Sequence, residues 1–173
     1  MTVPARPPTQ ARESWPPHAM DEWVPHRGAM NLLAAVEHCD DQTILARVVV
    51  PSQGLFVTDD GVPAWIGIEY MAQAVAAWSG ARARQEGGSP RIGFLLGSRR
   101  YEAMVSGFEV GSVLQVFAQC ELMGDNGLGM FDCRITQGER VLAAGRLSVF
   151  EPPVEQDNND EGSPGPAGAR EEG

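Results

Sequence analysis

The sequence contains no lysine, so all 13 of its basic residues are arginines. This absence excludes enzymes that form a Schiff base on a lysine side chain. Cysteine is also scarce: the odd number and wide spacing of Cys39, Cys120 and Cys133 match no metal-ligand pattern. Three such thiols fit a reducing compartment, in which buried cysteines act as small hydrophobic groups. We therefore expect no metal site.

Long apolar runs are missing as well. No stretch of about 18 apolar residues suggests a membrane span, and residues 1–18 lack the apolar segment of a secretory signal. We therefore expect a cytoplasmic protein without a membrane span. The net charge of −10 argues against nucleic acid as the main partner.

The composition divides the chain into three parts. Residues 1–19 are rich in proline and predict a disordered arm, and residues 152–173 are rich in glycine, proline and acidic residues and predict a disordered tail. Residues 20–151 are long enough for one domain with a real core and too short for two. This central part carries 10 arginines and 16 acidic residues, a net charge of −6.

The pattern along the central part predicts strands on both sides of one long helix. Residues 21–25 predict a short helical turn ended by Pro25. Strands are expected, from β-branched residues, apolar alternation and turn signals, over residues 31–38, 42–50, 91–102, 112–123, 128–136 and 140–150. In the fourth of these, alternate residues from Leu114 to Leu122 should share one face. The order of strands and helix indicates an α+β fold.

The long helix should begin near Pro63, which is tolerated in a first turn, and end at Gly87-Gly88. It is apolar nearly all round, so we expect it to be buried with an antiparallel sheet wrapped about it. One carboxylate interrupts it, Glu69, and Gln73 follows on the same face one turn later.

An ionised carboxylate in such surroundings is costly, so a raised pKa or a firm partner is expected for Glu69. A glutamate kept in its acid form can serve as a general acid. The alternative is that Glu69 fills a gap in the core, paired with an arginine. Gln73 either orients this carboxylate by hydrogen bonding or only satisfies a buried neighbour.

Two segments resemble one family in detail. Residues 24–33, V-P-H-R-G-A-M-N-L-L, resemble the L-P-H-R-x-P-hydrophobic-L-L opening of the 3-hydroxyacyl-[acyl-carrier-protein] dehydratases. Residues 63–73, P-A-W-I-G-I-E-Y-M-A-Q, resemble their P-G-hydrophobic-L-x-x-E-x-M-A-Q helix start. With G-F-L-L-G at residues 93–97, this version is most similar to dehydratase-like proteins of aryl-polyene biosynthetic clusters. The resemblance covers residues 20–152 and implies the hotdog fold, an antiparallel sheet wrapped around one long buried helix.

The resemblance also implies a reaction, the loss of water from a 3-hydroxyacyl thioester to give a trans-2-enoyl thioester in fatty-acid-like or polyene biosynthesis. In the family a histidine removes the proton alpha to the thioester and the glutamate, here Glu69, protonates the departing hydroxyl. Backbone N–H groups at the helix start polarise the thioester carbonyl. The implied substrate-binding residues are Pro63, Ala64, Trp65, Gly67 and Gln73. No diffusible cofactor is implied, since the acyl group arrives on the phosphopantetheine of acyl carrier protein.

The catalytic histidine of the family is missing. It lies in G-H-F-P, about fourteen residues before the glutamate, and this chain has G-L-F-V there, with Leu55 in the histidine's place. His26, next to the N-terminal turn, is our candidate base, because His18 lies in the arm and His38 at a strand end. Alternatively, His26 only holds its turn, or Glu69 acts as both base and acid.

Partners are implied by the same resemblance. Hotdog domains usually form dimers whose sheets join edge to edge. The partner is a second copy of the chain or another hotdog subunit. In relatives the histidine and the glutamate come from different subunits. Trp65 and Trp78 either line an acyl channel or, more often for such residues, pack in the core. Five arginines lie around the helix end and in the next predicted strand: Arg82, Arg84, Arg91, Arg99 and Arg100. They form either a solvated face or a docking patch for the acidic acyl carrier protein.

Two other functions fit the sequence. In a hotdog thioesterase Glu69 would activate water or attack the thioester, and the missing histidine favours this alternative. In a non-catalytic subunit the chain would pair with an active dehydratase and shape its acyl pocket, which Leu55 supports.

Overall fold

The computed structural model describes residues 28–89 and 93–152. The predicted arm, the helical turn over residues 21–25 and the predicted tail beyond Pro152 lie outside these residues and stay predictions.

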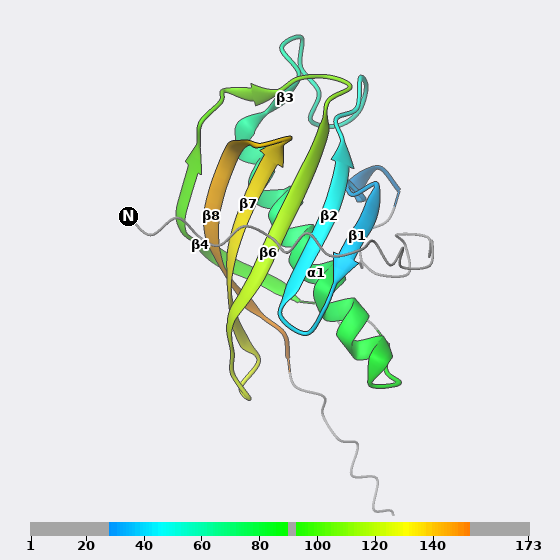
Figure 1. Cartoon of the computed structure of the whole chain (residues 1–173), viewed down its shortest axis with the longest axis vertical. Coiled ribbons are helices and arrows are strands. Elements are labelled where there is room, and N and C mark those ends of the chain that lie inside the picture. Colours follow the sequence, from blue (N-terminus) through cyan, green and yellow to red (C-terminus); the bar gives the residue numbers. More distant parts are fainter. Residues whose placement is uncertain (1–27, 90–92, 153–173) are drawn as a thin grey trace, which may run out of the picture.

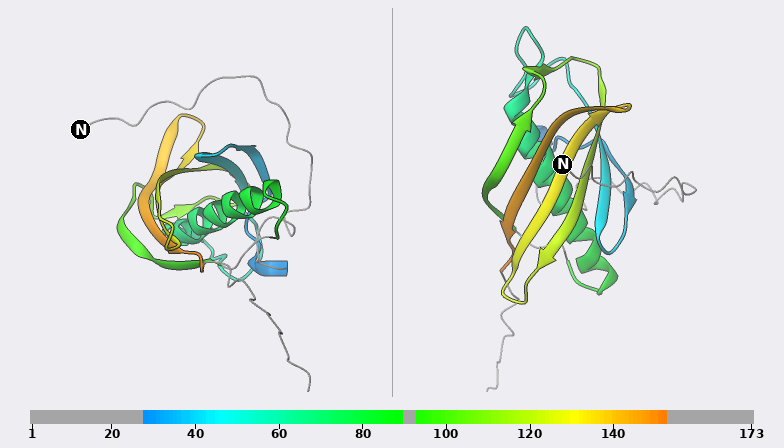
Figure 2. Two further views of the ribbon diagram at one scale, coloured as in Figure 1. Left: turned by 90° about the horizontal axis from the view of Figure 1, so that it is seen from below. Right: turned by 60° about the vertical axis from the view of Figure 1, so that its left-hand side comes forward.

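One antiparallel sheet curves around one helix, as expected for a hotdog fold (Figures 1 and 2). The strand order in this sheet is β1-β2-β6-β7-β8-β4, so β1 and β4 form its edges. Its six strands are β1 (Ala35–Cys39), β2 (Thr43–Val49), β4 (Phe94–Ala103), β6 (Val113–Met123), β7 (Leu128–Gln137) and β8 (Arg140–Phe150). The α+β prediction is confirmed.

The central helix, α1, spans Gly67–Gln85, and a 3-10 turn, η3 (Ala64–Ile66), leads into it. Pro63 belongs to a short strand, β3 (Val62–Pro63), which pairs with β5 (Gly107–Phe108) in a second, two-stranded sheet. This small sheet was not predicted, because two residues are too short to show a strand pattern. It fixes the start of the helix against the segment that leads into β6.

The core lies between α1 and the concave face of the sheet. Met71, Ala74 and Trp78 of α1 are at most 1% exposed, and they face buried side chains of the central strands. These side chains follow the period of two expected for strands with one buried face: Ile44, Ala46 and Val48 in β2, Leu114, Val116 and Ala118 in β6, and Phe131, Cys133 and Ile135 in β7. Trp78 is therefore a core residue, packed edge-on against Phe131.

Two details of the predicted strands are wrong. The first strand begins at Ala35 rather than residue 31, because the backbone near Met30 and Leu32 hydrogen-bonds to the side chain of Gln73. In β6 the pairing register shifts between Cys120 and Leu122. Such a bulge reverses the alternation, so Leu122 is 56% exposed instead of sharing the buried face.

Among the residues that the structure describes, no helix is long and apolar enough to cross a membrane.

Candidate active site

Glu69 lies in the first turn of α1, where a carboxylate is favoured by the helix dipole. Its side chain is half-buried, so the predicted deep burial is wrong. At 3.6 residues per turn, Glu69 points about 200° away from Met71, which faces the sheet, so the sheet does not cover it. Gln73 lies on the same side of the helix but is buried against the segment near residues 30–32, to whose backbone it hydrogen-bonds. The carboxylate therefore stands at the border between the core and the surface of the single subunit.

Gln73 connects this carboxylate to the N-terminal segment. Its side chain is completely buried, and its Nε2 donates to Glu69 Oε1 at 2.9 Å and to the Met30 carbonyl at 2.7 Å. Its Oε1 accepts from the Leu32 N–H at 2.8 Å. The expected hydrogen bond to Glu69 is thus present, and the backbone bonds show that Gln73 also satisfies buried neighbours. Both interpretations of this residue hold together.

The start of the helix presents few backbone donors. Pro63 has no N–H, the Ala64 N–H donates to the Ser106 carbonyl at 3.0 Å, and the Gly67 N–H bonds to helix carbonyls. The Ile66 N–H belongs to the i→i−3 bonds of the 3-10 turn η3, which leaves the Trp65 N–H at a first-turn position without an intrahelical acceptor. A carbonyl group that approaches this turn would meet this donor.

Tyr101 in β4 supports the helix start and was missed by the sequence analysis. Its phenol donates to the Ala64 carbonyl, and burial raises the pKa of this phenol to about 12, which keeps it a donor. A Cβ on Gly67 would collide with the Tyr101 hydroxyl, so only glycine lets the strand approach here. A tyrosine within a strand carries no sequence signal for this contact with a residue 37 positions away.

The helix start is flanked by exposed apolar side chains. Trp65 is 64% exposed, contrary to the expectation that it packs in the core, and its ring meets Phe56 edge-on at 6.4 Å between centroids. Leu55, in the place of the family's histidine, is 66% exposed in the same loop. The loop over residues 51–57 therefore lies against the start of the helix with Leu55 exposed, whereas Phe56 and Val57 are partly buried against the core.

A largely apolar pocket of about 300 Å³ opens beneath this loop. Leu55, Phe56 and Val57 line one side of it, Leu32 and Leu33 another, and Tyr70 of α1 reaches into it. Glu69 is not part of the lining. Gln73 nevertheless joins the two features, because it binds both the Glu69 carboxylate and the backbone of Leu32. The volume is at the lower end of the range usual for small-molecule sites.

Two histidines of the central part, His26 and His38, were considered for the catalytic base. His26 lies outside the described residues, so its candidate role as a base stays a prediction. His38 Nε2 lies 2.9 Å from Asp40 Oδ2 in the β1–β2 turn. Trp78 Nε1 donates to the Asp40 carbonyl, and Trp78 stands nine residues, or about 13 Å of helix rise, beyond Glu69. His38 therefore lies near the end of β1, at the far end of the helix from Glu69.

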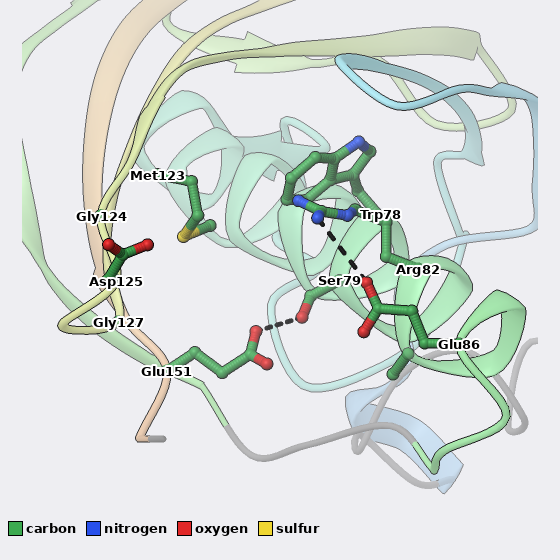
Figure 3. Close-up of a pocket in the computed structure, with 10 residues that line it drawn as sticks. Trp78, Ser79, Arg82, Glu86, Met123, Gly124, Asp125, Gly127 and Glu151 are labelled. Atoms are coloured by element: carbon green, nitrogen blue, oxygen red, sulfur yellow. Dashed lines mark hydrogen bonds and ion pairs between the residues drawn. The ribbon is translucent and has the colours of Figure 1, made fainter. Parts of the chain in front are cut away.

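The predicted arginines come from separate elements. Arg82 and Arg84 are in the last turn of α1, whereas Arg99 and Arg100 are exposed at the middle of β4. Arg82 lies over the Trp78 ring at 4.8 Å and 3.8 Å from Glu86. It lines a pocket of about 260 Å³ whose other charged members are Glu86, Asp125 and Glu151 (Figure 3). Arg91 lies outside the described residues.

Comparisons with known proteins give one family. The family model described as ApeP dehydratase (ApeP-like) matches residues 18–160. The structure of the dehydratase heterocomplex ApeI:P from Xenorhabdus doucetiae matches with a TM-score of 0.72 and 34% identity, over 78% of this chain and 91% of that chain. No curated protein sequence matches this chain.

More distant structures share only the fold. A hypothetical thioesterase with coenzyme A from Streptococcus pneumoniae TIGR4 has a TM-score of 0.54 and 16% identity, over 67% of this chain and 83% of that chain. The protein smu.793 from Streptococcus mutans UA159, bound to acetyl CoA, has a TM-score of 0.54 and 13% identity, over 68% of this chain and 86% of that chain.

Proposed function

The chain belongs to the ApeP-like dehydratase family, and from this premise we propose that it acts in the dehydration of a 3-hydroxyacyl thioester to a trans-2-enoyl thioester. The observation that carries the proposal is the Glu69 carboxylate, held by Gln73 in the first turn of α1 beside an apolar pocket. The substrate would be the acyl group on the phosphopantetheine of acyl carrier protein, in fatty-acid-like or polyene biosynthesis. No metal or diffusible cofactor is part of the proposal.

The resemblance to the dehydratases implies the proposed roles, and the position of Glu69 at the helix start supports them. A base removes the proton from C2, the electron pair forms the C2–C3 double bond, and the C3 hydroxyl leaves as water with a proton from Glu69. The thioester oxygen gains negative charge during this step. The backbone N–H group of Trp65, at the positive end of the helix dipole, would stabilise that charge. The pocket beside Tyr70 would take the apolar part of the acyl chain.

The base has three candidate sources. His26 is one, Glu69 itself is another, and a histidine from a second subunit is the third. Leu55 supports the third source, because this chain has no proton-transferring group at that place, and the relative from Xenorhabdus doucetiae is part of a heterocomplex. We propose a dimer with another hotdog subunit that complements the Glu69 of this chain.

The edge strand β4 is the proposed contact for that subunit. It pairs with β8 on one side only, and residues 93–100 are all exposed in the single chain. Three consecutive apolar side chains, Phe94, Leu95 and Leu96, are 53%, 42% and 58% exposed. An open edge with an apolar patch promotes association unless it is covered. Edge-to-edge pairing with a second hotdog sheet would cover both.

Docking of the acidic acyl carrier protein is proposed for Arg82 and Arg84 at the end of α1, as a steering interaction. This surface also contains Glu86, so the net attraction should be weak and sensitive to salt.

The test is an assay of dehydration, and of the reverse hydration, with 3-hydroxyacyl and enoyl groups on pantetheine and on acyl carrier protein. Wild type, Glu69→Gln and His26→Ala are compared, alone and with a hotdog partner subunit. Glu139→Gln is the matched control, because it makes the same change at an exposed turn residue outside the proposed docking surface. Loss of a general acid should lower the rate by about 10²-fold or more.

Each outcome has a distinct meaning. Activity that falls in Glu69→Gln but not in Glu139→Gln supports the proposed acid. An equal fall in His26→Ala assigns the base to this chain, whereas activity only with the partner assigns it to the partner. Release of free acid would identify a thioesterase instead. Unchanged activity of the complex in Glu69→Gln would show that this chain is a non-catalytic subunit.

A further inference from the structure

The middle of β4 carries an uncompensated positive charge. Arg99 and Arg100 are both exposed, and the pairing with β8 shifts register between Ser98 and Arg100. Arg100 forms an ion pair with Glu102 at 2.9 Å. For Arg99, no ion pair is found among residues 28–89 and 93–152. Charged side chains and bulges on an edge strand commonly prevent unwanted pairing.

A dimer of two identical copies through this edge would bring like charges together. In antiparallel self-pairing about the midpoint of the strand, residue 98 of one copy faces residue 99 of the other, because β4 spans residues 94–103. Arg99 and Arg100 of the two copies would then be diagonal neighbours, roughly 7–8 Å apart between backbones. Glu102 would face Leu95, so neither carboxylate would stand opposite an arginine.

Like charges at such cross-strand positions destabilise a sheet, and opposite charges stabilise it. The apolar residues Phe94–Leu96 favour association with any partner that buries them, but they do not distinguish one partner from another. The arginines do, because repulsion against a wrong partner is an effective means of specificity. In β4, residues 94–96 therefore favour association, and Arg99 and Arg100 determine which partner associates.

We propose that Arg99 and Arg100 select the partner of this chain: they disfavour a second copy and favour a different hotdog subunit whose matching edge strand carries carboxylates at its middle. This inference rests on the proposed pairing through β4. It assigns to Arg99 and Arg100 a role in subunit choice in place of carrier-protein docking.

The test uses a charge-reversed copy of the chain as the acidic partner. Full-length wild type and the double variant R99E/R100E, which carries a mass tag, are mixed in equal amounts at about 50 μM and measured by native mass spectrometry. The pairing ratio is the squared amount of mixed dimer divided by the product of the amounts of the two unmixed dimers. For random pairing this ratio is about 4. We expect a ratio at least about fivefold higher at roughly 20 mM salt, and a return toward the random value at about 0.5 M salt.

A matched control removes the effect of total charge. The variant R47E/R140E makes the same change of charge at two exposed arginines away from the middle of β4. Mixed with wild type, it should give the random ratio or no dimers. A random ratio for R99E/R100E, equal enrichment by the control variant, or monomers in every mixture would overturn the proposal. None of these results depends on activity, so they are separate from a failure of the proposed dehydratase function.

Discussion

Replacement of Gln73 by leucine tests the connection between the site and the fold. Leucine has a similar size but no polar atoms, so the variant loses three hydrogen bonds, to Met30, Leu32 and Glu69. A hydrogen bond contributes about 0.5–1.5 kcal/mol net, and more when one partner is charged. Glu69 is half-buried and Met30 is an exposed residue, so we expect water to restore part of the loss.

We therefore expect Gln73→Leu to lower the free energy of unfolding by about 2–3 kcal/mol. For a domain of this size each kcal/mol corresponds to roughly 3–5 °C in Tm, so Tm should fall by about 10 °C. The assay is thermal unfolding followed by circular dichroism, at one protein concentration because dimer formation would also shift Tm. The same variant should lose about tenfold in dehydration rate, the equivalent of one hydrogen bond of 1.4 kcal/mol to the reacting carboxylate.

The control is Gln85→Leu, the same substitution at an exposed position of α1. It should change Tm by no more than about 2 °C, since exposed substitutions usually stay within about 0.5 kcal/mol. Equal Tm values for the two variants would refute the reasoning. So would a Gln73→Leu protein with normal activity, because Glu69 would then not need the amide for its orientation.

Three further predictions concern other parts of the fold. Burial favours the neutral acid of Asp40, but hydrogen bonds from His38, the backbone and a neighbouring hydroxyl outweigh it and lower the pKa to about 2 from 3.8. The stabilisation is therefore present above about pH 4 and lost as pH falls through about 2. Because the side chain is about half exposed, Asp40→Asn should cost only about 1 kcal/mol at pH 7, and its Tm should approach that of wild type in acid. Gly67→Ala should lower stability by about 2 kcal/mol through the collision with Tyr101, and adding Tyr101→Phe should restore part of it in urea unfolding. Burial raises the pKa of the Cys39 thiol to about 12, so this thiol should resist Ellman's reagent at pH 8 until the protein is unfolded.

These predictions have their own contradicting results. An Asp40→Asn effect that stays constant from pH 7 to pH 3 would show that the carboxylate is not responsible. For Gly67→Ala the control is Gly93→Ala, where a Cβ would meet only an ordinary contact at 3.7 Å; equal losses in the two variants would contradict the collision. Rapid labelling of all three thiols in the native protein would contradict the burial of Cys39.

The sequence by itself determined the order of the long helix and the six strands of the main sheet, and the place of Glu69 at the start of that helix. Residues 63–73 predict a helix start with Glu69 and Gln73 one turn apart, because a helical period and its first-turn signals are local properties of the chain. The strands over residues 42–50, 128–136 and 140–150 were predicted to within about one residue of β2, β7 and β8. Turn residues and apolar alternation are also local properties of the chain, so the bounds of these strands could be predicted from the sequence.

Only the tertiary structure decided what surrounds Glu69 and the other parts of the fold. The Gln73 amide reaches backbone groups 41 and 43 positions away, the bulge after Cys120 exposes Leu122, and Trp65 turns outward instead of into the core. Each of these depends on how segments distant in sequence pack together, and no local pattern encodes that packing. The open edge of β4 is the clearest case: its residues alone predict a strand, and only its position at the end of the sheet makes it the edge at which we propose that a partner pairs.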